Sequence, residues 1–201
     1  MAALLAEARA AAARMQGGPC HNIRTTSACR PSGALAGCRG VTHNSHRRHN
    51  LQSSPMYIAD AKRLTHEGAK KMMATAVEQA RQAGIAISCC VADAGGHIVV
   101  LERMDGGRFH TLHSCTTKAV CAASNRRETS AKGAVGQDLD VVHALGLALA
   151  AGPERWTAME GGVPVLVGGE CIGGVGVSGG DWQTDLRIAK AAVESIGASW
   201  K

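Results

Sequence analysis

The sequence predicts an α+β fold in which helices cover an antiparallel sheet. Two apolar, β-rich regions, residues 85–103 and 161–178, are each interrupted by a glycine-containing turn, which is the pattern of a β-hairpin. Segments with helical spacing of small and apolar residues lie before, between and after these hairpins. Because hairpins pair antiparallel strands and the helices are segregated from them, we expect an antiparallel sandwich and not a parallel Rossmann sheet.

Residues 1–56 form an arginine-rich N-terminal extension that differs from the rest of the chain. Seven of the chain's 22 basic residues and one of its 16 acidic residues lie there, so residues 57–201 carry 15 of each and are neutral. The acid-poor, Ser-containing composition is typical of an organellar transit peptide, with a translated upstream region or a disordered tail as alternatives. We expect one domain over residues 57–201.

The first half of this domain is expected to hold a helix and a hairpin. Apolar and small residues recur at helical spacing over residues 58–84, and Gly84 stands where a helix commonly ends. The nearly continuous apolar run 85–92 predicts a buried strand. The turn Asp93-Ala94-Gly95-Gly96 then joins it to a second strand over residues 97–103.

The second half is expected to hold three helical segments and another hairpin. Residues 111–126 predict a helix with one small-residue side, and residues 138–151 a helix or a pair of turns that ends at Gly152-Pro153. Residues 161–178 predict a hairpin with Gly168-Gly169 as its turn. A last helix runs to Ile196, with Asp181 or Thr184 as its cap.

Composition excludes several classes of protein. The eight cysteines include no Cys-x-x-Cys pair, and Cys89 and Cys90 point to opposite faces of a strand, so they cannot bind one metal. We expect reduced thiols in an intracellular protein, cytoplasmic or, with a transit peptide, mitochondrial. No apolar stretch is long enough for a transmembrane helix. A neutral domain with five aromatic residues predicts no nucleic-acid partner.

Glycine-rich residues 173–181 only superficially resemble a dinucleotide-binding loop, because the glycines lie within a strand. Such a strand allows either a flat ligand or another backbone to approach closely, and a structural role is favoured. Ser178-Gly179-Gly180 before a helix is a candidate nest for a carboxylate. Structural roles are likewise favoured for Asp93, Asp105, Asp181 and Asp185, all of which lie at turns or at a helix start.

The histidines His66, His97, His110, His113 and His143 are the candidates for a haem or metal ligand, although each is individually more typical of a surface residue. His110 and His113 share a face at i, i+3 spacing. Neither His-Glu-x-x-His nor Cys-x-x-Cys-His occurs, which excludes a zinc protease and a covalent cytochrome.

A collinear set of motifs covers residues 58–198 and resembles the GlcG/HbpS haem-binding-like family, which includes the C-terminal domain of PduO-type corrinoid adenosyltransferases. The matching motifs are Ile58-Ala59-Asp60-Ala61-Lys62-Arg63-Leu64, Val91–Gly96, Arg103-Met104-Asp105-Gly106, Lys118-Ala119, Thr129, Gly161-Gly162-Val163-Pro164, Ile172–Gly180 and Asp185.

The resemblance implies an α-β-α sandwich around a five-stranded antiparallel sheet of profilin or roadblock type, and self-association into dimers or larger oligomers. It also implies non-covalent haem binding in some members, through a histidine of the first helix, for which His66 is the candidate here. Adenosyltransferase activity is not expected, because it belongs to a separate helical domain that residues 1–57 do not resemble.

A haem site needs an apolar slot, an axial ligand and partners for the propionates. The sequence offers His66 as the ligand and Lys62, Arg63 and Arg103 as propionate partners. The slot would be formed by Met72, Met73 and the glycine face that includes Gly174 and Gly176. A small haem- or tetrapyrrole-binding sensor or carrier is therefore the first hypothesis. The alternatives are a cofactor-free oligomeric interaction module and an enzyme acting on a small hydroxy acid or carbonyl compound, with Lys118, Asp105 or Asp185 as acid/base groups.

Overall fold

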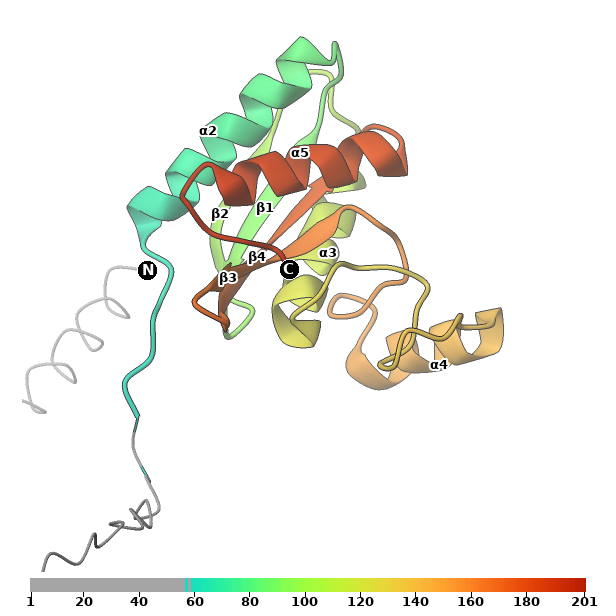
Figure 1. Ribbon diagram of the computed structural model, residues 1–201. Coiled ribbons are helices and arrows are strands. Elements are labelled where there is room, and N and C mark those ends of the chain that lie inside the picture. Colours follow the sequence, from blue (N-terminus) through green and yellow to red (C-terminus); the bar gives the residue numbers. More distant parts are fainter. Residues whose placement is uncertain (1–56, 58) are drawn as a thin grey trace, which may run out of the picture. The chain divides into compact units, whose positions relative to one another are not determined.

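The computed structural model describes Tyr57 and residues 59–201, so the expected transit peptide lies outside the described residues (Figure 1). Eight elements follow one another in the order helix, hairpin, two helices, hairpin, helix. They are α2 (His66–Gln82), β1 (Ser88–Asp93), β2 (Ile98–Arg103), α3 (Thr111–Asn125), α4 (Val141–Ala151), β3 (Gly162–Val167), β4 (Glu170–Ser178) and α5 (Trp182–Glu194). The predicted order of elements is therefore confirmed.

The strands form an antiparallel sheet in the order β2-β1-β4-β3, which places the two hairpins side by side. The expectation of five strands is wrong, because this part of the chain forms four. Ser199, near the C-terminus, makes two backbone hydrogen bonds with Leu166 of β3, of 2.8 and 2.9 Å. This contact is an isolated bridge and does not extend into a fifth strand.

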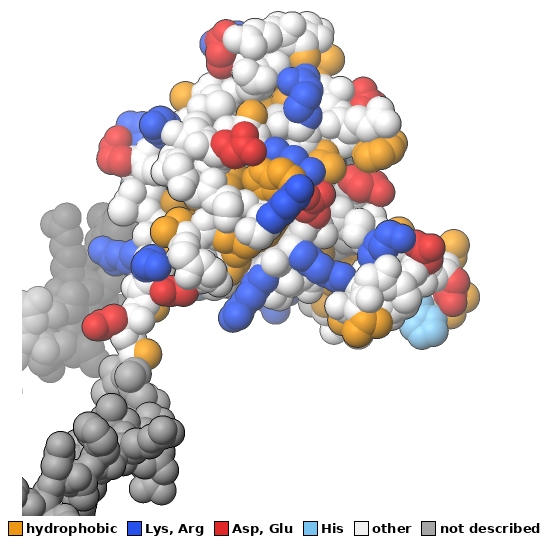
Figure 2. Space-filling view, viewed as in Figure 1, with side chains coloured by type: hydrophobic (Ala, Val, Ile, Leu, Met, Phe, Trp, Pro, Cys, Tyr) orange, Lys and Arg blue, Asp and Glu red, His pale blue; other side chains and the backbone are white. Residues whose placement is uncertain are grey.

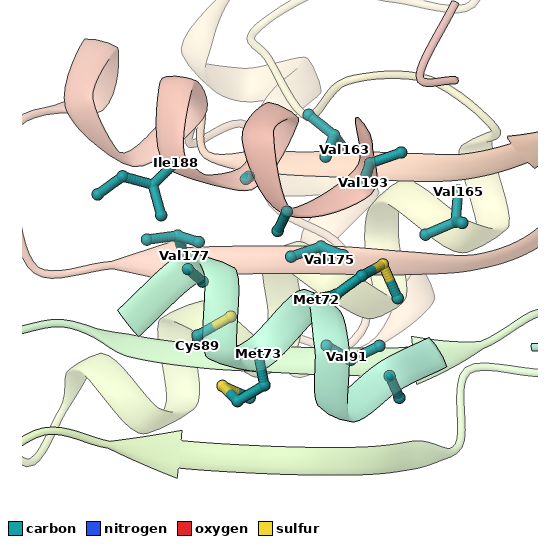
Figure 3. Close-up of a cluster of buried hydrophobic side chains, with 14 of the residues drawn as sticks. Met72, Met73, Cys89, Val91, Val163, Val165, Val175, Val177, Ile188 and Val193 are labelled. Carbon is teal, nitrogen blue, oxygen red and sulfur yellow. The ribbon is translucent and has the colours of Figure 1, made fainter. Parts of the chain in front are cut away.

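Helices cover both faces of the sheet, so the three-layer α-β-α arrangement is confirmed. Helices α2 and α5 lie side by side over one face, and α3 lies on the other (Figure 1). Large buried side chains fill the α2/α5 side, where Met72 and Ile188 pack on the valines of β1, β3 and β4 (Figure 3). Burial of these apolar side chains is the main stabilising contribution on this face.

The opposite face of the sheet is lined by small residues. Cys90, Ala92, Gly174 and Gly176 are paired across β1 and β4 and face α3, which presents Cys115 and Ala119 to them. A Cβ on Gly176 would overlap the carbonyl oxygen of Cys115, and one on Gly174 would overlap that of Ala119. The helix backbone therefore rests directly on the strand, which is the close approach that glycine permits.

Helix α2 begins at His66 and not at Ile58, so the expected N-terminal bound is wrong. Thr65 is its cap and accepts a hydrogen bond from the Gly68 amide at 3.1 Å. The preceding segment is held elsewhere, because the Lys62 amide donates to Glu170 and its Nζ donates to the carbonyl of Val167. These bonds tie residues before the helix to the β3–β4 turn and compete with continuation of the helix.

The predicted turns and caps agree with the structure. Gly168 and Gly169 both have positive φ, 62° and 82°, as a tight two-residue hairpin turn requires. Asp181 caps α5 by accepting from the Thr184 amide at 2.9 Å, and Gly84 follows α2 with a φ of 67°.

Helix α4 differs from the other helices because it has no buried residue. It contains no charged side chain other than the titratable His143, and its apolar residues are exposed: 82 % for Val141, 80 % for Val142 and 68 % for Leu149. Apolar side chains are correspondingly visible on the surface around α4 (Figure 2). Among the described residues, no helix is long and apolar enough to cross a membrane.

Candidate functional site

A cavity of about 610 Å³ lies between the β1–β2 turn and the outer side of α3. The turn forms one wall, α3 forms the floor, and the end of α4 with the segment after it forms the opposite wall. The lining residues are Ala94, Gly95, Gly96, His97, Val120, Ser124, Asn125, Ala151, Arg155 and Trp156. Its volume is within the range of small-molecule and cofactor sites.

The turn at this cavity is built around the Asp93 carboxylate. Its Oδ1 accepts hydrogen bonds from the backbone amides of Gly95 and His97, each at 2.9 Å, while the Gly96 amide donates to the Asp93 carbonyl at 3.0 Å. Gly96 has a φ of 82°, which explains why glycine stands there. The sequence signal for the hairpin therefore also fixes the position of His97.

The His97 ring is bound to the same carboxylate. Its Nδ1 lies 3.2 Å from both carboxylate oxygens of Asp93. Burial alone raises the pKa of the Asp93 carboxyl, but the hydrogen bonds from His97 and Gly95 outweigh it, and the pKa lies below its usual value. A carboxylate that accepts the Nδ1 proton leaves Nε2 with a free lone pair, the arrangement found in many metal-binding histidines.

The other walls add an apolar surface and one cation. Val120 and Ala151 are apolar and Trp156 is half-buried, while Arg155 is exposed and its Nε lies 3.5 Å from Glu154 Oε1. An exposed guanidinium can bind a carboxylate of a ligand whose body lies on the apolar wall. Sequence reasoning missed Arg155 and Trp156; their position after the Gly152-Pro153 turn gave no signal of what they would face.

The structure brings together three of the residues predicted for a haem site at the start of α2. His66 is the first residue of the helix, and its side chain is 65 % exposed. Lys62 lies just before it, with its Nζ 3.3 Å from Glu170 Oε1, and Arg63 is exposed in the same segment. His66 is not among the residues that line the cavity between the β1–β2 turn and α3.

The remaining predicted site residues lie elsewhere. Met73 is 3 % exposed and belongs to the core beneath α2 (Figure 3). Arg103 lies at the end of β2 and donates through Nη1 to the Gly107 carbonyl at 2.6 Å. Gly174 and Gly176 are covered by α3, so a backbone and not a flat ligand makes the close approach.

The predicted carboxylate nest is occupied by a side chain of the domain itself. Asp185 Oδ1 accepts from the Gly180 amide at 2.9 Å, and its Oδ2 lies 3.1 Å from Lys118 Nζ. Lys118 also donates to the Val177 carbonyl at 2.8 Å, and both charged side chains are at most 5 % exposed. Burial keeps this pair from meeting a substrate, and Asp105 lies exposed in a separate loop. The pair therefore has a structural role, locking α3 to β4 and α5.

The described part of the chain contains no group of three or more His, Cys, Asp or Glu residues placed to hold a metal ion. Its cysteines are free, and burial raises the pKa of Cys90 to about 11 and that of Cys115 to about 12. Cys89 and Cys90 do lie on opposite faces of the sheet, as predicted.

Comparison with known proteins identifies the family of this domain. Residues 64–194 match the family model described as "Haem degrading protein HbpS-like". Protein GlcG of Escherichia coli K12 is 38 % identical over 115 residues, which are 57 % of this chain and 81 % of GlcG.

Two solved structures have the same fold. Protein ORFY of Klebsiella pneumoniae, with 28 % identity and a TM-score of 0.62, matches over 72 % of this chain and 98 % of its own. The structure titled PduOC:Heme Complex has a TM-score of 0.60 over 69 % of this chain and 99 % of its own; at 24 % identity the likeness shows the fold alone. Since the family model matches well over half of the chain, this protein belongs to the HbpS-like family.

Proposed function

We propose that this protein binds haem in the cavity beside His97, where the His97 Nε2 would hold the iron. The observation that carries the proposal is the Asp93–His97 pair at the wall of a 610 Å³ cavity, because it supplies an imidazole whose other nitrogen is already bound. Membership of a family named for haem-related proteins supports it independently.

The residues around the cavity fit such a group. Val120, Ala151 and Trp156 offer apolar contact to a macrocycle, and Arg155 offers a cation to a propionate. Bound haem would supply ligand-binding and redox chemistry that the side chains of this domain lack. The buried state of Lys118 and Asp185 favours a sensor or carrier over an enzyme. Free cysteines in the domain favour an intracellular location.

The test is a titration of the full-length chain with haemin, followed in the Soret band. We expect a saturable shift in the wild type, its loss in His97→Ala, and an affinity lower by about tenfold or more in Asp93→Asn, because the ring loses its anionic partner. His143→Ala, which removes an exposed histidine outside the cavity, is the matched control.

His66→Ala decides between the two candidate ligands. Retention of the Soret shift in this variant supports the cavity. Its loss in His66→Ala but not in His97→Ala would place the ligand at the start of α2, as the family resemblance implies, and contradict our assignment. Absence of a saturable shift in the wild type would reject haem binding altogether.

Self-association with a second copy is a second candidate function, favoured by the exposed apolar side chains of α4. Because α4 carries no Asp, Glu, Lys or Arg, two copies can meet around a twofold axis without charge repulsion. Multi-angle light scattering should show an oligomer that Leu145→Asp with Leu149→Asp dissociates, while Glu154→Lys does not. An unchanged mass in the α4 variant would reject this surface.

A further inference from the structure

A second cavity, of about 410 Å³, lies between the first turns of α3, the end of β4 and the segment after α4. It is lined by histidines, hydroxyl residues and apolar residues, and among its lining residues none is acidic and none is Lys or Arg. The lining residues are His110, His113, Ser114, Thr117, Pro153, Trp156, Thr157, Met159 and Ser178. Only Trp156 also lines the cavity beside His97.

The inner part of this cavity is polar and buried. Ser178 is 8 % exposed, and its Oγ lies 2.9 Å from Ser114 Oγ. Ser114 Oγ also lies 3.4 Å from the carbonyl oxygens of His110 and Thr111, which are long contacts. When Ser114 donates to Ser178 instead, the Ser178 hydroxyl keeps its hydrogen for a ligand. Thr157 is also 8 % exposed, and its Oγ1 accepts from the Met159 amide at 3.1 Å, so its own hydrogen is free to donate. Both sites can therefore donate to an oxygen atom inside the cavity.

Two exposed imidazoles line the cavity at i, i+3 spacing: His110 is the N-cap residue of α3, and His113 lies in its first turn. Arg108 and Lys118 are engaged within the domain: Arg108 donates to the Gly179 carbonyl, and Lys118 is paired with Asp185. Glu154 and Arg155, between the lining residues Pro153 and Trp156, are paired with each other. His110 and His113 are therefore the groups of the lining that can become charged, and any charge that they gain is positive. A negatively charged ligand complements this lining, whereas a cation does not.

Three apolar residues complete the lining and favour a ligand with an apolar body. Pro153, Trp156 and Met159 also line the cavity. We propose that this cavity binds a small monocarboxylate with an apolar body, whose carboxylate accepts hydrogen bonds from the Ser178/Ser114 pair and from His110 and His113. The apolar body then packs on the indole of Trp156.

The test uses ¹H–¹⁵N NMR on the full-length chain without haem, with benzoate as the probe and benzamide as its neutral isostere. The Trp156 indole resonance is identified by its loss in Trp156→Phe. We expect a saturable shift with benzoate at millimolar affinity. Benzamide should bind more weakly than benzoate, by a factor of about ten or more.

The double variant His110→Ala, His113→Ala should weaken benzoate binding about tenfold or more. Both histidines are exposed, and the His110 side chain makes no capping bond, so the fold is expected to survive. His143→Ala is the matched control and should bind like the wild type. Equal affinity for benzamide, no shift with benzoate, or full binding in the double variant would each overturn the proposal. Haem binding by the double variant is expected to remain, so the two proposals fail separately.

Discussion

The two faces of the sheet are built on opposite packing rules. On the α2/α5 side, large side chains such as Met72 and Ile188 fill the space between helix and sheet. On the α3 side, Gly174 and Gly176 let the helix backbone touch the strand, and a buried ion pair joins the layers. The first face depends on apolar volume, whereas the second depends on the absence of side chains and on polar geometry.

The two faces also differ in where the cavities lie. Both cavities with histidines lie beside α3, while α2 and α5 bury their inward side chains in a continuous apolar core. Close backbone packing holds α3 at a fixed distance from β1 and β4. It therefore fixes Val120, Ser124 and Asn125 relative to the β1–β2 turn that carries His97.

The largest effect is expected where the α3 side holds charge. Lys118→Met leaves Asp185 buried without its cation and should lower the free energy of unfolding by about 3–5 kcal/mol. Urea denaturation measures this loss. In the control Lys190→Met, which breaks the partly exposed Lys190–Glu128 pair, the loss should be about 1 kcal/mol or less. Similar losses in both variants would contradict a structural role for the buried pair.

A smaller effect is expected from a single added methyl group. Gly176→Ala forces a Cβ into the backbone of α3 and should cost about 3 kcal/mol in the same assay. Gly146→Ala is the matched control, because a Cβ there meets no atom within 4 Å and the helix gains up to about 1 kcal/mol. If Gly176→Ala were as stable as the wild type, the close-packing interpretation would be wrong.

The smallest effect concerns the charge at the β1–β2 turn. The lowered pKa of Asp93 means that its carboxylate stabilises the folded state above its ordinary pKa of about 4, and that this contribution is lost as pH falls through the folded-state pKa. Asp93→Asn keeps an acceptor oxygen but removes the charge. Because Asp93 is partly exposed, the loss at neutral pH should be about 1 kcal/mol or less. The urea midpoints of the wild type and Asp93→Asn should converge in strong acid. A difference between them in strong acid as large as that at neutral pH would contradict this interpretation.

Turn chemistry and caps made much of the fold predictable. Both hairpins could be located from the sequence because their turns are specified locally, by Asp93-Ala94-Gly95-Gly96 and by Gly168-Gly169. In the same way, the capping residue Asp181 specifies the start of α5. The predicted start of α2 was wrong because the helical spacing of apolar residues continues before Thr65. Hydrogen bonds from Lys62 to Glu170 and Val167, which are far away in the sequence, hold that segment out of the helix. Such contacts depend on tertiary structure and leave no local signal.

The candidate site was less predictable for the same reason. His97 was recognised as a histidine of the hairpin, and its pairing with Asp93 follows from the turn. Arg155 and Trp156 reach the cavity only because the segment after α4 folds back over α3. From the sequence, either a flat ligand or another backbone could approach the glycine-rich strand closely. The structure shows that the backbone of α3 makes this approach.

Hydrogen–deuterium exchange of the full-length chain with and without haemin tests most directly whether the α3 side carries the function. We predict that haemin slows amide exchange in residues 94–97, 120–125 and 151–156, which surround the cavity, and leaves the core of α5 unchanged. Protection confined to residues 62–70 would instead place the ligand at the start of α2 and contradict the assignment of the cavity beside His97.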